Sequence, residues 1–188
     1  LQMSVAYPSL KVRLVGFLPG IMTPGGVTHQ AIEDLAIVRA IPNMTILEVG
    51  DATEAESVLD VAHKVDGPVY IRMLRGEVSR IFPKDEPFIF NTARILSTGT
   101  DITLITSGIM TEEALRAIPL LQERGVSISH LHVSTMKPFT DLRIIAALKT
   151  AKSGVITMEN HSIIGGLGSA VAEVMAENGI SAPLQRIG

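Results

Sequence analysis

A glycine-rich loop that runs into a helix-forming stretch carries the residues of this sequence best suited to chemistry. The loop reads Gly25-Gly26-Val27-Thr28-His29-Gln30, and Ala-Ile-Glu-Asp-Leu-Ala follows. Glycine lets a backbone approach a ligand closely, Thr28 can cap a helix, and a helix N-terminus favours oxyanions. His29 can donate or accept a proton near neutral pH. The pattern predicts a site for a small polar substrate, although a capped helix with a solvent-facing histidine has the same pattern.

Arginines form a second candidate group. Arg72 and Arg75 close a predicted strand at the same sheet edge as the His29 loop. A guanidinium there can form a paired bond with a phosphate or a carboxylate. The alternative is a surface ion pair with Glu77 or Asp66. Arg75 is the stronger candidate for an anion site.

Other polar groups have structural explanations that compete with chemistry. The run Gly165-Gly166-Leu167-Gly168 lies where a strand meets a helix but lacks the spacing of the dinucleotide and P-loop motifs, so close packing or a subunit contact is the better explanation. His130 and His132 share one face of a strand, as two metal ligands would, but no third ligand is evident. We therefore expect no metal site among these residues. His63 is expected to be solvated on a helix.

The elements that position these residues follow from hydrophobic periodicity and from Gly and Pro stops. One helix begins behind the capping sequence that Asp51 opens and stops before Gly67. Further helices are predicted at residues 30–40, 111–124, 141–149 and 167–178. Strands are predicted at residues 12–17, 44–49, 69–73, 102–105, 127–133 and 154–158, with a last one cut short at 183–188.

This alternation predicts an α/β protein of two domains with mainly parallel sheets. The pattern breaks at Pro83-Lys84-Asp85-Glu86-Pro87 and then restarts. We therefore predict a first domain at residues 1–82, a linker at 83–90 and a second domain at 91–188. The first domain is expected to lack its beginning and the second its end, as in a piece of a longer chain.

The composition excludes several classes of protein. The chain has 188 residues, 46% of them hydrophobic, with 16 basic and 19 acidic side chains. It contains no basic block, so a nucleic-acid partner is not expected. The absence of cysteine excludes disulfides and thiolate catalysis and fits a cytoplasmic protein. No apolar run reaches the roughly 18 residues of a membrane span, so no membrane partner is expected.

Taken together, the motifs resemble the transketolase family, and most closely the carboxyl-terminal subunit of split bacterial transketolases. The resemblance runs in order from about Ala6 to the end of the chain. It rests on Gly-Val-Thr-His-Gln-Ala-Ile-Glu-Asp-Leu-Ala (26–36), Ala-Ile-Pro-Asn-Met-Thr-Ile-Leu (40–47), Asp-Ala-Thr-Glu-Ala-Glu (51–56), Asp-Gly-Pro-Val-Tyr-Ile-Arg (66–72) and Glu-Asn-His-Ser-Ile-Ile-Gly-Gly-Leu-Gly-Ser-Ala-Val-Ala-Glu (159–173).

The resemblance implies a fold and a function. Residues 1–82 would be the later half of a pyrimidine-binding domain, and residues 91–188 a transketolase C-terminal domain. The family transfers a two-carbon ketol unit between sugar phosphates with thiamine diphosphate and a divalent metal, Mg²⁺ or Ca²⁺. His29 matches the histidine that contacts substrate oxygens and helps proton transfer, and Arg75 matches the arginine that grips the substrate phosphate.

The resemblance also implies partners. The glutamate and the aromatic residue that serve the cofactor ring would lie upstream of Leu1, and another domain or an amino-terminal subunit would hold the diphosphate and metal. The assembly would be a homodimer or heterotetramer, and this chain would be inactive alone.

Two departures from the family pattern leave the sugar unassigned. Pro24-Gly25-Gly26 replaces the usual Gly-Glu-Asp-Gly run, and Phe17-Leu18-Pro19-Gly20 lacks a substrate-binding histidine. Alternative functions are a 1-deoxyxylulose-5-phosphate synthase, a 2-oxoacid dehydrogenase β subunit or a non-catalytic assembly module.

Overall fold

The first sheet is built mainly from parallel strands of the amino-terminal half. In the computed structural model, which describes residues 1–188, β1 (Arg13–Phe17), β3 (Val69–Met73) and β2 (Thr45–Glu48) pair in parallel in that order. Their carboxyl ends lie at one edge, which also carries Arg72 and Glu48 in paired register. Parallel strands bring the residues at their ends together, so this edge collects side chains that are distant in sequence.

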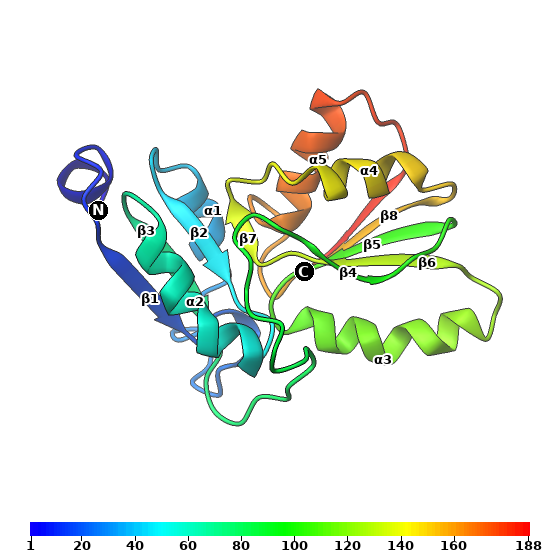
Figure 1. Cartoon of the computed structure of the whole chain (residues 1–188), viewed down its shortest axis with the longest axis horizontal. Helices are drawn as coiled ribbons and strands as arrows, with labels where there is room; N and C mark the ends of the chain where they lie inside the picture. The colour runs from blue at the N-terminus through cyan, green and yellow to red at the C-terminus, as the bar shows by residue number, and fades with distance from the viewer.

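The second sheet contains five strands in the order β4-β6-β5-β8-β9. The strands β6 (Ile128–His132), β5 (Ile102–Thr106), β8 (Gly154–Met158) and β9 (Leu184–Ile187) are parallel, whereas β4 (Arg94–Ser97) runs antiparallel to β6. Figure 1 shows this sheet beside the first, with the amino-terminal half in blue and cyan.

Helices cover both faces of the second sheet, because alternate residues of a strand face opposite sides. Leu104 of β5 packs with α3 (Met110–Gln122), whereas its neighbour Ile105 packs with α4 (Leu142–Thr150) and α5 (Leu167–Glu177). Figure 1 shows α3 on one side of this sheet and α4 and α5 on the other.

The first sheet has α1 (Asp34–Arg39) and α2 (Ala52–Lys64) as its helices. Asp51 caps α2, since its side chain accepts a hydrogen bond from the backbone N–H of Glu54. Two short helical turns complete the chain, a π-helix at Gln2–Ala6 and a 3-10 turn at Gly20–Met22.

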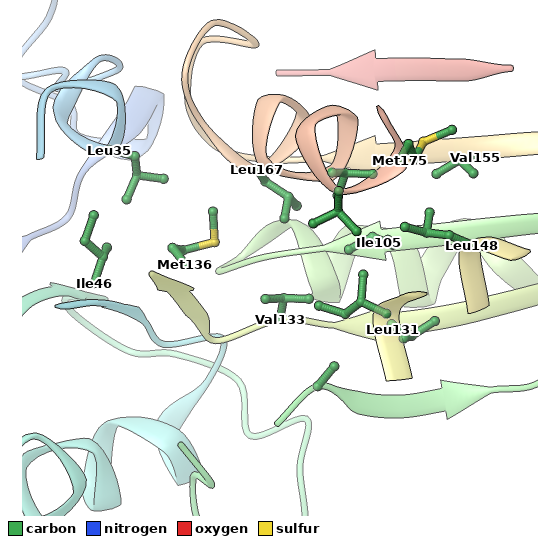
Figure 2. Packing of buried hydrophobic residues seen from close by; sticks show 14 of the residues in the cluster. Leu35, Ile46, Ile105, Leu131, Val133, Met136, Leu148, Val155, Leu167 and Met175 are labelled. Carbon is green, nitrogen blue, oxygen red and sulfur yellow. The ribbon is translucent and has the colours of Figure 1, made fainter. Parts of the chain in front are cut away.

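The two halves share one hydrophobic core. The strand β7 (Thr135–Lys137) comes from the second half but pairs antiparallel with β2 of the first sheet. Its Met136 is fully buried, and Figure 2 shows it between Leu35 and Ile46 on one side and Leu167 and Ile105 on the other. Burying a side chain of this size contributes about 1.5–3 kcal/mol, so the core itself holds the halves together.

The prediction of an α/β fold with two mainly parallel sheets is confirmed. The strands at 69–73 and 154–158 have their predicted bounds, and the last strand lies at Leu184–Ile187. The sequence does not predict β4 or β7, whose pairing is antiparallel. The domain bounds stay a prediction. None of the helices is long and apolar enough to cross a membrane.

The predicted helix at 30–40 is wrong in its start. The helix α1 begins only at Asp34, has Glu33 at its N-cap, and receives no side-chain cap. Thr28 is therefore not a helix cap, and His29 does not lie at a helix mouth. The reason is long-range hydrogen bonding, because the carbonyls of Ala31 and Ile32 accept from Gly20 N at 2.7 Å and from Ser162 N at 2.8 Å.

Candidate functional site

The loop from residue 18 to residue 33 presents His29 to solvent. The backbone N–H of His29 donates to Gly26 O at 2.9 Å, and its Nδ1 lies 2.9 Å from Thr28 Oγ1. A Cβ at Gly25 would lie 2.7 Å from Cγ of the His29 ring, so the ring packs where only glycine fits. With Nδ1 engaged, Nε2 is left without a partner in the chain. His29 therefore has an accessible nitrogen for a hydroxyl or a carbonyl group of a ligand.

Arg75 is exposed and lies two residues beyond the end of β3. Its guanidinium does not take part in the ion pairs of the chain, which involve Arg39, Arg72, Arg80, Arg94 and Arg116. The ion pair with Glu77 or Asp66 that the sequence offered as an alternative is therefore not formed. The Arg75 guanidinium is available to an anion from outside the chain.

Arg72 has a different role, because it is 1% exposed and its partners are internal. Its Nε and Nη2 donate to the two oxygens of Asp34 at 2.8 and 3.0 Å, and its Nη1 donates to Glu48 Oε1 at 2.5 Å. Tyr70 also donates to Asp34, at 2.7 Å. Arg72 thus joins β2, β3 and α1 directly beneath the His29 loop.

The hydrogen bonds between Arg72, Asp34 and Glu48 shift the pKa values of Asp34 and Arg72. Burial raises the pKa of Asp34, but the hydrogen bond and the charge of Arg72, with the Tyr70 hydroxyl, outweigh it and leave that pKa below its ordinary value. Burial opposes the charge on Arg72, whereas Glu48 and Asp34 raise its pKa. Asp34 and Arg72 therefore remain charged at neutral pH and serve as a fixed ionic support.

The glycine run at 165–168 is filled by a carboxylate of the protein. Glu159 accepts from Leu167 N at 2.6 Å and from Gly168 N at 2.8 Å, at the N-terminus of α5. A Cβ at Gly166 would lie 1.8 Å from Glu159 Oε2, and one at Gly165 would lie 2.4 Å from the Cβ of Ala36. The prediction of close packing is confirmed. Burial, with a smaller contribution from Glu48, raises the pKa of Glu159 to about 7.

The histidines His130 and His132 lie on β6 and are both fully buried. His130 Nε2 lies 2.9 Å from Thr106 Oγ1, and His132 Nδ1 lies 2.6 Å from Thr111 Oγ1. Burial lowers the pKa of His130 to about 4, and the neighbouring His132 adds to this shift. One ring nitrogen of each histidine is thus bonded to a threonine hydroxyl, whereas His130 Nδ1 has no partner within the chain. His63 is exposed, as predicted.

Glu54, His132 and Ser134 form a buried group that the sequence analysis did not predict. His132 Nε2 lies 3.1 Å from Glu54 Oε2, and Ser134 Oγ donates to Glu54 Oε1 at 2.6 Å. The three side chains resemble a hydrolytic triad, but each is at most 4% exposed, so no substrate reaches them. Burial raises the pKa of Glu54, but His132, Ser134 and the Gly50 N–H outweigh it and lower that pKa to about 2. The group joins the two halves of the chain.

A diphosphate or a divalent metal does not fit the residues of this chain. The one glycine-rich helix start is filled by Glu159, and no group of three or more His, Cys, Asp or Glu side chains is placed to hold a metal ion. A cavity of about 510 Å³ opens between the His29 loop and residues 159–163, and Ile21, Ile32 and Ile163 line it. Neither His29 nor Arg75 contributes to that lining.

Comparisons with known proteins identify the family of this chain. The family model of the transketolase pyrimidine binding domain matches residues 2–80, and that of the transketolase C-terminal domain matches residues 91–188. A putative transketolase C-terminal section of Methanocaldococcus jannaschii is 42% identical over 187 residues, which cover 98% of this chain and 58% of that protein.

One further relative is similar in sequence, and one solved structure is similar in fold. A 6-deoxy-6-sulfo-D-fructose transketolase subunit of Clostridium sp. is 42% identical, with 99% of this chain and 58% of that protein covered. A solved structure described as a split gene transketolase, inactive beta4 tetramer, superposes with a TM-score of 0.91 at 36% identity and covers 100% of this chain and 59% of that one. The chain thus spans just under three fifths of the length of these relatives, and it belongs to the transketolase family.

Proposed function

We propose that this chain is the carboxyl-terminal part of a transketolase that transfers a two-carbon ketol unit between sugar phosphates. The observation that carries the proposal is the exposed His29, held on a loop at the carboxyl edge of the first sheet in a chain of this family. Thiamine diphosphate dependence comes with the family. In this proposal His29 hydrogen-bonds a substrate hydroxyl or carbonyl oxygen and moves a proton there.

Arg75 is proposed to bind the phosphate of the sugar. Its guanidinium is exposed, unpaired within the chain and just past β3, and a planar guanidinium matches phosphate oxygens in a paired geometry. A sulfonated sugar is a second donor candidate, because the Clostridium relative bears the name of a 6-deoxy-6-sulfo-D-fructose transketolase subunit. A sulfonate presents oxygens in a similar arrangement at the end of the sugar.

The cofactor and its metal are proposed to be held largely outside these residues, in an amino-terminal domain or subunit. Because Glu159 fills the glycine run and no metal cluster is present, this chain offers no cradle for the diphosphate or for Mg²⁺ or Ca²⁺. We propose a cytoplasmic assembly with that subunit, as a homodimer or heterotetramer. The family relative described as an inactive beta4 tetramer supports oligomerisation and the need for a partner.

The test is a donor assay on the chain with and without its amino-terminal partner. Ketose phosphate and 6-deoxy-6-sulfofructose are offered as donors with an aldose phosphate acceptor, in the presence of thiamine diphosphate and Mg²⁺. We expect ketol transfer only in the assembled protein. Turnover of pyruvate instead would assign the chain to the 1-deoxyxylulose-5-phosphate synthase or 2-oxoacid dehydrogenase group. No turnover by a stable assembly with any donor would leave the assembly module as its function.

A further inference from the structure

The two ends of the His29 loop meet at Gly20. The backbone N–H of Gly20 donates to Ala31 O at 2.7 Å, which closes the loop two residues beyond His29. Gly20 is buried and has a φ of +76°, a conformation that side chains disfavour. The tip of the loop, residues 24–29, is exposed on every residue. The side chain of His29 contacts only the tip itself, so the placement of the whole tip on the protein depends on how this closure is held.

A side chain of the second half holds the closure. Asn160 Oδ1 accepts from Ile21 N at 3.0 Å, and Asn160 Nδ2 donates to Pro19 O at 3.1 Å. The amide thus grips the backbone on both sides of Gly20. A Cβ at Gly20 would lie only 2.2 Å from Asn160 Oδ1, so the contact requires glycine at that position. Asn160 itself is 9% exposed and lines the cavity that opens beside the loop.

The ionic support beneath the loop fixes Asn160 in turn. Arg72 Nη2 donates to Asn160 O at 3.0 Å and lies 3.4 Å from Ala31 O. One guanidinium therefore contacts both Asn160, which binds the loop backbone, and Ala31, whose carbonyl closes the loop. Ser162 N donates to Ile32 O at 2.8 Å and ties the segment that follows Asn160 to the same end of the loop. Hydrogen bonds from the second half therefore fix both ends of the loop that contains His29.

We propose that Asn160 is a positioning residue that places the His29 loop, so that the carboxyl-terminal domain contributes to the reaction through the loop without touching substrate. The proposal rests on the proposed function for its catalytic consequence, but the placement of the loop does not depend on it. The side-chain amide of Asn160 supplies the acceptor for Ile21 N and the donor for Pro19 O at neutral pH. Glutamine does not replace Asn160, because its longer side chain would collide with the backbone at Gly20.

The first experiment measures the loop directly, without activity. Hydrogen exchange of the Ile21 and Gly20 amides is compared in the full protein and in Asn160→Leu and Asn160→Asp. We expect several-fold faster exchange in Asn160→Leu and a smaller increase in Asn160→Asp, which keeps the acceptor for Ile21. Exchange in β6 serves as the internal control for folding. Unchanged exchange at both loop amides overturns the proposal, whatever the protein catalyses.

The second experiment measures turnover in the assembled protein with its amino-terminal partner. We expect Asn160→Leu to lower kcat about 10- to 100-fold with little change in KM, because misplacing a reacting group by about 1 Å has that effect. In a His29→Ala background the same substitution should change kcat less than about 3-fold, since residues that act as a unit are non-additive. Full additivity of the two losses overturns the proposal.

Matched controls separate placement from general damage. Asn178→Leu and Asn178→Asp make the same changes at an asparagine at the end of α5, whose side chain bonds Val174 O, and they should leave kcat and loop exchange unchanged. The kcat of Asn160→Asp relative to the unsubstituted protein should rise as the pH falls, because a protonated carboxyl regains a donor for Pro19 O. A flat relative pH profile contradicts the assignment. Faster loop exchange with no effect of His29→Ala on turnover would reject the proposed function and keep the loop placement.

Discussion

Glu54 and His132 bond to each other across the junction of the two halves, with 3.1 Å between Glu54 Oε2 and His132 Nε2. Glu54 lies in the first turn of α2 and His132 at the end of β6, so 78 positions of sequence separate them. Both side chains are at most 1% exposed. Phe82 covers the pair, since its ring centroid lies 4.9 Å from that of His132. The pair is one of several polar contacts between the two halves, together with those of Asn160 and Ser162.

We predict that His132→Ala destabilises the protein by about 1–3 kcal/mol, because buried Glu54 loses one hydrogen-bond partner and keeps only those from Arg94, Ser134 and Gly50. Urea unfolding measures the loss. The matched control is His63→Ala, an exposed histidine of α2, which should change the free energy of unfolding by less than about 0.5 kcal/mol. Equal stability of the two variants would contradict the role of the pair.

The same pair predicts an acid-dependent loss of stability. The pKa of Glu54 is lowered in the folded state from 4.5 to about 2. Its contribution is therefore fully present above the unfolded value and is lost as the pH falls from about 4.5 to about 2. Unfolding measured across this range should show a shallower pH dependence in Glu54→Gln than in the unsubstituted protein. An identical slope in both proteins would reject the assignment.

We predict that His29→Ala lowers the turnover of the assembled enzyme by about 10²-fold or more, as the loss of a positioned proton donor does. Steady-state kinetics with the partner subunit measures this, and the His63→Ala variant is the control with unchanged turnover. The free energy of unfolding should not change, because the His29 side chain is exposed. Normal turnover in His29→Ala would remove His29 from the reaction.

We predict that Arg75→Ala raises KM for phosphorylated donors with little change in kcat, because it binds a remote group equally in ground and transition states. The control is Arg124→Ala, an exposed arginine beyond the end of α3. The comparison of phosphorylated, sulfonated and unsubstituted ketoses identifies the anion. An equal loss for charged and uncharged donors would show that Arg75 does not bind the phosphate.

We predict that Gly166→Ala destabilises the protein by about 1–3 kcal/mol, the usual result of overpacking. The added Cβ would lie 1.8 Å from Glu159 Oε2 and would displace the carboxylate from α5. Thermal unfolding measures the effect. The control is Glu177→Ala, which changes an exposed residue at the other end of α5. A Gly166→Ala variant as stable as the Glu177→Ala control would mean that the hydrogen bonds of the Glu159 carboxylate to the start of α5 do not stabilise the protein.

Local sequence determined most of the regular elements. The β-branched and aromatic stretch at Val69–Met73 forms a strand with its predicted bounds, and Asp51 begins α2 because its cap is made within three residues. Motif order also determined the family, since two domain models match in the expected order. These features depend on residues close in sequence, where propensity and capping act.

Tertiary structure alone decided the site. The start of α1 depends on bonds from Ala31 and Ile32 to partners as distant as Ser162, and Arg72 lies against Asp34 and Glu48 only because three elements meet there. The same holds for Asn160, whose amide reaches across 139 positions to Ile21. No period or motif encodes such contacts, because each arises when the strand ends of two sheets and the shared core bring distant residues to one place.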